Sequence, residues 1–408
     1  MKKGLLFPCL VAALGGLLFG YDFVVVGGAK PFYEPYFGIA GSEHAWAAGF
    51  AMSSAVLGCI LGAVGFMWVP DRLGRRPSLF LSSVFFTLCA ILTAISTSYW
   101  GFVGARVLGG LGIGIASNAS PLYIAEMAPA DKRGRLVALN QFTIIFGISL
   151  AQFVNWVIFK TVPDTSLNWR VMFGVAVIPA VVFFALTWFI PESPKWLARR
   201  DREASEPVVA GRWKGVWGAV ALGIFLAALQ QWCGINVVFN YAEDVFKAAG
   251  FDVSGVMFNQ VIGGIVNFAF TILAMTLVDK VGRRPLMLLG CGGLAVVYAA
   301  LGLSYYNGFK GVGVLALVLA AIACFALTLG PVVWVVLSEL FPIRVRGTAM
   351  SIAVAALWMS CYGLTLTFPP INAACGAAGT FWLYGAICVI GFGVCARFLH
   401  ETKGKELD

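Results

Sequence analysis

The stretch that decides the fold occurs twice in the chain. Residues 71–76 read Asp-Arg-Leu-Gly-Arg-Arg, and residues 279–284 read Asp-Lys-Val-Gly-Arg-Arg, 208 positions later. A second pair of motifs, at 126–134 and 339–347, shares a Glu, a Pro three residues on and an Arg-Gly, and is 213 positions apart. Spacings near half of the 408 residues indicate an internal duplication.

The repeated motifs lie between long apolar runs. The composition is 60% hydrophobic and only 12% charged, about half the charge of a soluble domain. A bilayer core about 30 Å thick needs about 20 apolar residues per helix. Twelve runs fit, at 5–28, 45–69, 77–97, 101–124, 136–159, 169–190, 215–247, 254–278, 285–306, 311–338, 347–370 and 378–399.

These runs predict an all-α membrane protein with twelve transmembrane helices in two pseudo-symmetric bundles of six. The charged stretch 191–214 is the longest segment without a membrane run. We therefore expect an N-terminal bundle at 1–190, a short cytoplasmic linker at 191–214 and a C-terminal bundle at 215–408. Two repeats of this kind suit alternating access to a site near the bilayer midplane.

The positive charges predict the orientation. With both termini on one side, 22 of the 28 Lys and Arg residues fall there. The positive-inside rule then places both termini in the cytoplasm, as expected for a multi-pass inner-membrane protein. The net charge of +9 is spread over short loops, so we expect no nucleic-acid partner. The ten Cys form no C-x-x-C pair, and we expect neither a metal nor a cofactor.

Two charged residues interrupt the apolar runs of the first half. Asp22 lies six residues before the end of the first run, and Arg106 lies five residues into the fourth. Each charge is costly inside a bilayer, and both are expected about 8–9 Å below the outer boundary. We therefore expect them to pair. Separating the carboxylate from Arg106 would favour its protonation, which gives a proton switch; the alternative is a static buried ion pair.

At this point the chain resembles the major facilitator superfamily, and within it the sugar porter family. Its bacterial xylose–proton symporters are the most similar members. The residues that carry the resemblance extend over the whole chain. They are 15–22 (GGLLFGYD), 106–110 (RVLGG), 191–194 (PESP), 230–231 (QQ), 330–334 (GPVVW) and 401–404 (ETKG).

The resemblance implies a set of functional residues. Proton-coupled relatives have an Asp at the position of Asp22, with Arg106 as its partner. Neutral amides suit sugar hydroxyls because they both donate and accept hydrogen bonds, and Trp faces suit the ring. The candidate sugar ligands are Gln141, Gln230, Gln231, Asn236, Asn267, Trp334 and Trp358.

The repeated polar motifs predict a gate on the cytoplasmic side. We expect their acids and arginines to form an ion-pair cluster that holds the two halves shut there. The members are Asp71, Arg75, Arg76, Glu126, Arg133, Glu192, Asp279, Arg283, Arg284, Glu339, Arg346 and Glu401.

The chain also departs from the family pattern. Relatives often have Gln at the positions of Ile148 and Leu357, and xylose symporters have a Tyr pair where this chain reads Asn240-Tyr241. The sugar is therefore left open between a pentose and a hexose. We expect a monomer, not an enzyme, whose partners are the monosaccharide, protons and the lipid bilayer. The alternatives are a facilitative sugar uniporter and, less favoured, a membrane sugar sensor.

Overall fold

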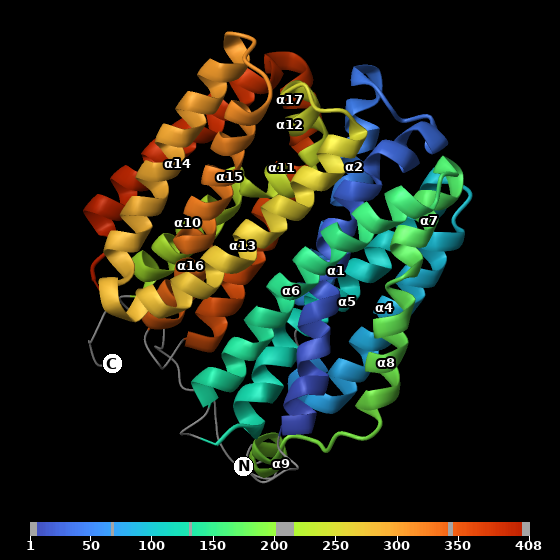
Figure 1. The fold of residues 1–408 in the computed structure, drawn as a ribbon. Helices are drawn as coiled ribbons and strands as arrows, with labels where there is room; N and C mark the ends of the chain where they lie inside the picture. Colours follow the sequence, from blue (N-terminus) through green and yellow to red (C-terminus); the bar gives the residue numbers. More distant parts are fainter. Residues whose placement is uncertain (1–5, 67–68, 130–132, 201–215, 342–345, 402–408) are drawn as a thin grey trace. The chain divides into compact units, whose positions relative to one another are not determined.

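The computed structural model describes residues 6–66, 69–129, 133–200, 216–341 and 346–401, and these residues are mainly helical (Figure 1). The chain divides into two compact units, one of residues 1–40 and 50–208 and the other of residues 41–49 and 209–408. Residues 201–215, which include most of the predicted linker, lie outside the described residues. The predicted bundle boundaries therefore stay a prediction.

The N-terminal half is built around α1, which packs on α5 and α6. Small residues allow the closest approach: a Cβ on Gly20 would lie 1.9 Å from the Ile144 carbonyl oxygen, and one on Gly147 would lie 2.2 Å from that of Leu17. The helices are α1 (Leu6–Phe37), α2 (Ala45–Ile60), α3 (Val69–Arg72), α4 (Arg75–Ile95), α5 (Tyr99–Met127), α6 (Arg133–Thr161), α7 (Thr165–Gly174), α8 (Val177–Thr187) and α9 (Pro194–Arg200). A short 3₁₀-helix at Ser42–His44 precedes α2, and a π-helical stretch at Leu61–Gly65 continues it.

The C-terminal half repeats this plan with more interruptions. Its helices are α10 (Trp217–Trp232), α11 (Ile235–Asn240), α12 (Ala242–Ala248), α13 (Val253–Val281), α14 (Arg283–Tyr306), α15 (Val312–Leu327), α16 (Leu329–Leu340) and α17 (Arg346–Phe398). Three predicted spans are broken: 215–247 at Gly234 and Tyr241, 311–338 at Thr328, and, in the first half, 169–190 between α7 and α8. Hydropathy does not detect such breaks, because they leave the apolar run intact.

Within the described residues, eleven helical segments are long and apolar enough to cross a membrane. The last one, Ala349–Phe398, covers two predicted helices and contains a kink at Gly376, where φ is 65°. At about 1.5 Å per residue, α17 is far longer than the thickness of a bilayer. The multi-pass helical membrane class is confirmed, while the count of twelve helices stays a prediction.

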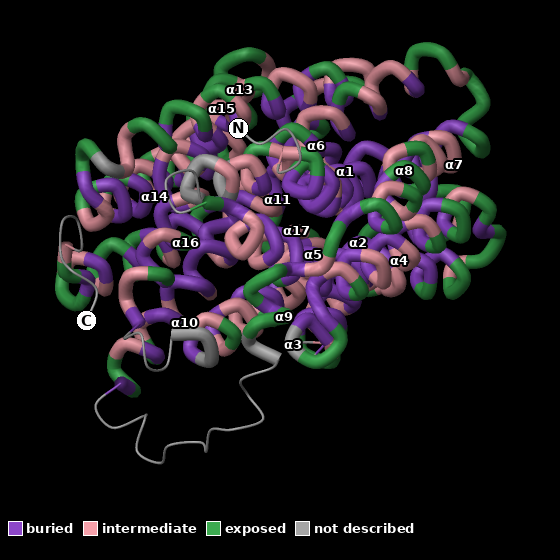
Figure 2. The backbone as a smooth tube through the Cα atoms, turned by 90° about the horizontal axis from the view of Figure 1, so that it is seen from below, coloured by how far each residue is buried: buried purple, intermediate pink, exposed green. Residues whose placement is uncertain are grey.

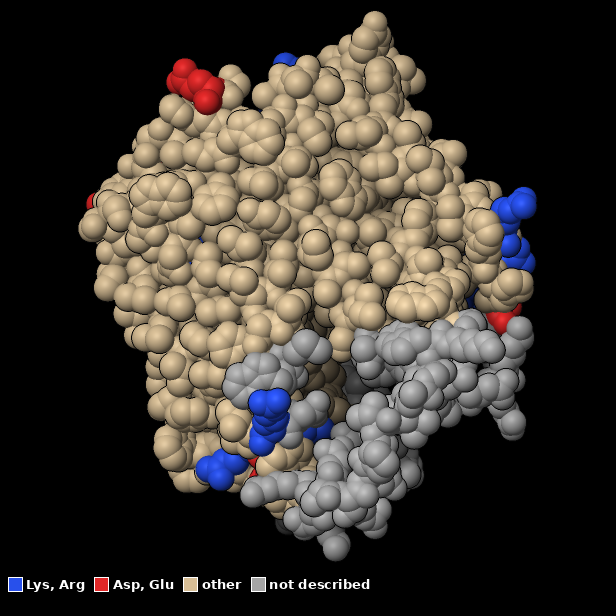
Figure 3. Space-filling model, turned by 180° about the vertical axis from the view of Figure 1, so that it is seen from behind, with Lys and Arg blue, Asp and Glu red and all other residues tan. Residues whose placement is uncertain are grey.

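The outward surfaces of these helices are apolar. Exposed side chains include Val296 of α14 (71%) and Ile178 of α8 (68%). Figure 2 shows that α1, in contrast, is buried along most of its length. In Figure 3, few charged atoms interrupt a broad area of uncharged surface. A soluble protein rarely exposes so much apolar surface, so these faces indicate contact with lipid.

Candidate functional site

The two charges predicted inside the membrane meet in the N-terminal half. Arg106 on α5 forms an ion pair with the Asp22 carboxylate on α1, and its Nη2 also donates to the Asp22 backbone oxygen at 2.9 Å. Asp22 is 7% exposed and Arg106 is fully buried. The pairing that the sequence suggested is therefore present in the structure.

One oxygen of this carboxylate is left without a protein partner. Asp22 Oδ2 is buried and makes no hydrogen bond to a described residue. Asp22 Oδ1, by contrast, accepts from Arg106 and lies 3.7 Å from the Cys89 thiol on α4. The guanidinium also stacks over the Phe173 ring at 5.2 Å. A carboxylate with one bonded and one unbonded oxygen has a place for a proton.

The predicted end of the first helix is wrong, while the depth of Asp22 in the membrane stays a prediction. Helix α1 continues for nine residues beyond the predicted end at 28, which places Asp22 about 22 Å from the end at Phe37. Within this extension the buried charges Lys30 and Glu34, one turn apart, form an ion pair at 3.3 Å. The predicted apolar run ended before these two charges, because hydropathy scores each residue alone and does not count an ion pair between two of them.

The repeated Arg and Glu motifs form a compact cluster at one end of the N-terminal half. The Arg75 guanidinium binds the Glu126 carboxylate of α5, with contacts of 2.9–3.2 Å. The Glu192 carboxylate accepts hydrogen bonds from the backbone N–H groups of Arg75 and Arg76 at 3.0–3.2 Å. Glu192 therefore caps the N-terminus of α4, where unpaired N–H groups and the helix dipole favour an anion.

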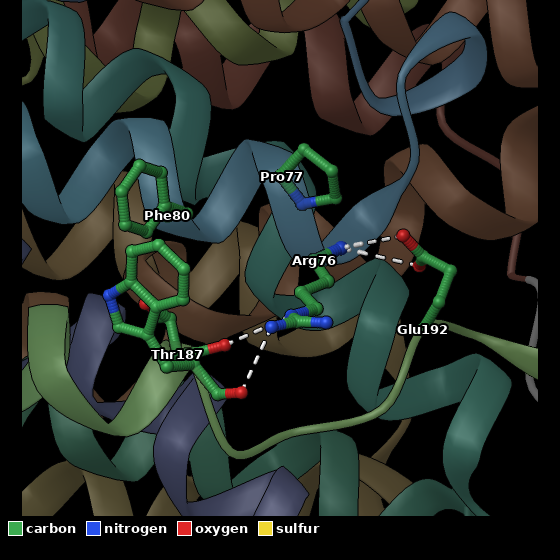
Figure 4. A pocket seen from close by; sticks show the side chains of 6 residues that line it. Arg76, Pro77, Phe80, Thr187 and Glu192 are labelled. Carbon is green, nitrogen blue, oxygen red and sulfur yellow. Dashed lines mark hydrogen bonds between the residues drawn. The ribbon is translucent and has the colours of Figure 1, made fainter.

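The glycine of the motif makes this cap possible. Gly74, directly before α4, has a φ of 113°, and a Cβ there would lie 2.2 Å from Glu192 Oε2. Beside the cap is a hollow of about 270 Å³, which is lined by the residues drawn in Figure 4. There Arg76 donates to the backbone oxygens of Thr187 and Trp188 at 3.2 and 2.9 Å. The motif thus ties α4 to the segment that follows α8.

The C-terminal half contains the same arrangement. Arg283 binds the Glu339 carboxylate at 2.8 and 3.1 Å. Glu401 accepts from the backbone N–H groups of Arg283 and Arg284, at 3.0 Å each, and so caps α14. Gly282 has a φ of 103° and contacts Glu401 as Gly74 contacts Glu192. The duplication therefore extends from sequence to individual hydrogen bonds.

Part of the predicted gate falls outside this description. The side chains of Asp71, Arg133, Asp279 and Arg346 lie outside the described residues. The other eight predicted members form ion pairs, helix caps and carbonyl contacts inside their own halves. These contacts explain why the motif needs Glu and Gly besides Arg. The predicted closure between the halves stays a prediction.

Three of the predicted sugar ligands form a hydrogen-bonded chain at the break between α10 and α11. The Gln230 amide donates to the backbone oxygens of Leu329 and Gly330 at 3.1 and 2.8 Å. Gln231 donates to Gln230 at 3.4 Å, and Asn236 donates to Gln231 at 2.5 Å. Gln230 therefore satisfies carbonyls where α15 gives way to α16, and its amide nitrogen is already occupied.

The remaining predicted ligands lie on four other helices. Gln141 on α6 is half-buried and Asn267 on α13 is buried, and neither side chain has a hydrogen bond to a described residue. Trp334 on α16 is 37% exposed, whereas Trp358 on α17 is 4% exposed. Free amides are suited to a ligand, because an unpaired buried amide is costly.

Further buried polar groups lie outside the predicted ligand set, although the sequence already set Asn240 apart as a departure from the Tyr pair of xylose symporters. Gln152, Asn240, Asn259 and Gln260 are each at most 4% exposed, and each has an atom without a hydrogen-bond partner among the described residues. One signal was available for Gln152: it follows Gln141 by eleven residues, so both occupy one face of α6. The same periodicity places Gln260 on the face of Asn267.

A buried Asp–Arg pair among long helices with apolar outer faces indicates a polytopic membrane protein with a functional site inside it. The family model described as sugar (and other) transporter matches residues 8–216 and 203–408. The chain belongs to this sugar transporter family.

Curated relatives match over nearly the whole of this chain. The D-xylose-proton symporter of Escherichia coli K12 is 37% identical over 98% of this chain and 93% of its own. The arabinose-proton symporter of Bacillus subtilis is 32% identical, covering 97% and 92% of the two chains. The glucose facilitated diffusion protein of Zymomonas mobilis is also 32% identical, covering 98% and 95%.

A solved structure confirms the fold. The partially occluded, inward-open xylose transporter XylE from E. coli matches with a TM-score of 0.88. The two chains are 35% identical, and the match covers 100% of both. The expected major facilitator fold is therefore confirmed, and family and fold indicate a transporter rather than an enzyme.

Proposed function

We propose that this protein couples the entry of protons to the uptake of a monosaccharide by alternating access. The observation that carries the proposal is the buried pair Asp22–Arg106 with its free Asp22 Oδ2. The names of the D-xylose and arabinose symporters support the substrate class. Protonation of Asp22 would weaken its attraction to Arg106 and so favour movement of α1 against α5.

The sugar would bind to neutral amides in both halves. Gln141 and Asn267 have free side chains, while Gln231 and Asn236 are joined to each other and are able to exchange that bond for one to a hydroxyl. Trp334 and Trp358 would provide apolar faces for the ring. The protein would act as a monomer in a cell inner membrane with both termini in the cytoplasm, where the basic loops place them.

A facilitative uniporter is the second candidate. The 32% identical relative from Zymomonas mobilis is named as a facilitated diffusion protein. The relatives of this chain therefore include both proton symporters and a facilitated diffusion protein. In a uniporter, Asp22–Arg106 would be a static ion pair. The two candidates differ in whether sugar accumulates against its gradient.

Labelled-sugar uptake into proteoliposomes separates the two functions. The wild-type protein should accumulate D-xylose, arabinose or glucose only when a proton gradient is imposed. Asp22→Asn keeps the size of the side chain but removes its charge, and should abolish accumulation while sugar exchange without a gradient persists. Gradient-driven accumulation by Asp22→Asn would refute the role of this carboxylate, and a wild-type protein that only equilibrates sugar would be a uniporter.

A further inference from the structure

The Cys89 thiol of α4 faces the buried carboxylate of Asp22. Its Sγ lies 3.7 Å from Asp22 Oδ1, which is within hydrogen-bond distance for sulfur. Cys89 is only 2% exposed. A buried cysteine usually behaves as a small apolar residue, but its S–H group is also a donor. Two groups therefore meet on Asp22 Oδ1, the charged Arg106 from α5 and the neutral thiol from α4.

The groups around the sulfur determine the direction of its proton. Thr93 Oγ1, one turn further along α4, lies 3.7 Å from Cys89 Sγ, and Arg106 Nη1 lies 4.0 Å from it. The guanidinium is only a donor, and the ionised Asp22 is only an acceptor. A carboxylate is a stronger acceptor than the Thr93 hydroxyl, because it is charged. The thiol therefore donates its single proton to Asp22 and accepts from Thr93.

A glycine on α5 leaves room for this thiol. A Cβ on Gly109 would lie 2.4 Å from Cys89 Sγ and 3.2 Å from Asp22 Oδ2. The sulfur and the second carboxylate oxygen therefore face the same position on α5. Because the thiol and Arg106 both bind Oδ1, Oδ2 keeps no hydrogen-bond partner among the described residues and has a place for a proton.

Other ionisable groups make no described hydrogen bond to this carboxylate. Helices α4, α5, α6, α7 and α8 pack on α1. Apart from Cys89 and Arg106, the described ionisable side chains on these helices and on α1 are Cys9, Tyr21, Lys30, Tyr33, Glu34, Tyr36, Arg75, Arg76, Tyr99, Tyr123, Glu126, Lys160 and Arg170. Tyr21 adjoins Asp22 in sequence, but its hydroxyl donates to the Met172 oxygen at 2.8 Å. The donors to the Asp22 side chain are thus Cys89 and Arg106.

We propose that Cys89 is a positioning residue of the proton site, whose thiol stabilises the ionised form of Asp22 from α4. This inference rests on the proposed function. Together with Arg106 the thiol holds Oδ1, so that the incoming proton is taken up on Oδ2. A hydrogen bond donated to a carboxylate favours its charged form. The thiol therefore helps Asp22 to release its proton again after each transport cycle.

Three variants of the full-length protein in proteoliposomes test this role. Cys89→Ala removes the donor, and Cys89→Ser keeps one. Cys9→Ala is the matched control, because it removes another fully buried thiol, on α1 itself but thirteen residues or about 20 Å from Asp22. Infrared spectroscopy follows the C=O band of the protonated carboxyl during a pH titration, and the band is assigned to Asp22 by its loss in Asp22→Asn.

The titration midpoint is expected to depend on the donor. Loss of the thiol disfavours the carboxylate, so the midpoint should rise by about 0.5–1 pH unit in Cys89→Ala. Cys89→Ser should lie between Cys89→Ala and the wild-type protein, and Cys9→Ala should match the wild type. The pH at which gradient-driven sugar uptake is half-maximal should move in the same direction in Cys89→Ala.

The outcomes separate this inference from the proposed function. An unchanged midpoint in Cys89→Ala overturns the inference. So does a midpoint of Cys89→Ser equal to that of Cys89→Ala, which would make Cys89 a packing residue, or an equal rise in Cys9→Ala. A wild-type protein that accumulates no sugar under a proton gradient overturns the proposed function together with this inference. When sugar does accumulate, the infrared midpoints decide the inference alone.

Discussion

Replacing Gly74 by Ala should destabilise the protein through two separate effects. At a φ of 113° and a ψ of 168°, a conformation essentially restricted to Gly, an L-residue costs about 1–3 kcal/mol. The new Cβ would also lie 2.2 Å from Glu192 Oε2 and push the carboxylate away from the backbone N–H groups of Arg75 and Arg76. Loss of a helix N-cap costs a further 0.5–2 kcal/mol, roughly. The sum is about 2–5 kcal/mol.

The internal repeat supplies a second variant and a ranking. Gly282 has the same role before α14, but a Cβ there would lie 2.7 Å from Glu401 Oε2, so Glu401 needs to move less. We therefore expect Gly282→Ala to destabilise the protein less than Gly74→Ala. Gly104 on α5 is the control, because a Cβ there meets nothing within 4 Å. Gly104→Ala should be neutral or stabilising by up to about 1 kcal/mol.

Thermal unfolding of the purified protein in detergent measures all three variants. The expected order of melting temperatures is Gly74→Ala lowest, then Gly282→Ala, then wild type, with Gly104→Ala at or above the wild-type value. Glu192→Gln retains an acceptor oxygen and should fall between Gly74→Ala and the wild-type protein. If Gly74→Ala has the same melting temperature as Gly104→Ala, then Glu192 does not cap α4, and the proposed reason for a glycine at position 74 is refuted.

Two further predictions concern buried polar groups. Gln230→Leu should lower the melting temperature even without sugar, because the carbonyls of Leu329 and Gly330 lose their donor. The expected cost is about 1–3 kcal/mol. An unchanged melting temperature would show that this amide serves only the ligand. Arg106→Leu should destabilise by about 3–5 kcal/mol by leaving Asp22 buried and unpaired, and adding Asp22→Asn should restore much of the loss. Melting curves of the single and double variants check this, and additive losses would contradict it.

The sequence predicted the elements of the fold more reliably than their ends and breaks. A bilayer sets the length of each span, so apolar runs reveal helices such as α4, α5 and α14 within a few residues. Breaks at Gly234 and Thr328 were missed, since the residues around them are as apolar as a continuous helix. The end of α1 was missed because Lys30 and Glu34 lower the hydropathy of this segment, although their ion pair lets both charges lie buried in the helix.

The candidate site was predicted in part. Asp22 and Arg106 stood out because charges are rare in apolar runs, and the resemblance to sugar porters then supplied the amides. The double role of Gln230 was not visible, because its partners Leu329 and Gly330 are a hundred residues away and contribute backbone atoms. Gln152, Asn259 and Gln260 were passed over as single polar residues, since only burial without a partner distinguishes them.

The repeated stretches 71–76 and 279–284 separate what the sequence determines from what the tertiary structure decides. By itself, the sequence determined the duplication, the membrane class and the positions of Asp, Gly and Arg. Only the tertiary structure decided that Glu192 and Glu401, more than a hundred residues further on, cap the helices that follow Gly74 and Gly282. Hydropathy and motif spacing are local properties of the chain, whereas a hydrogen bond depends on the distance between atoms that folding alone brings together.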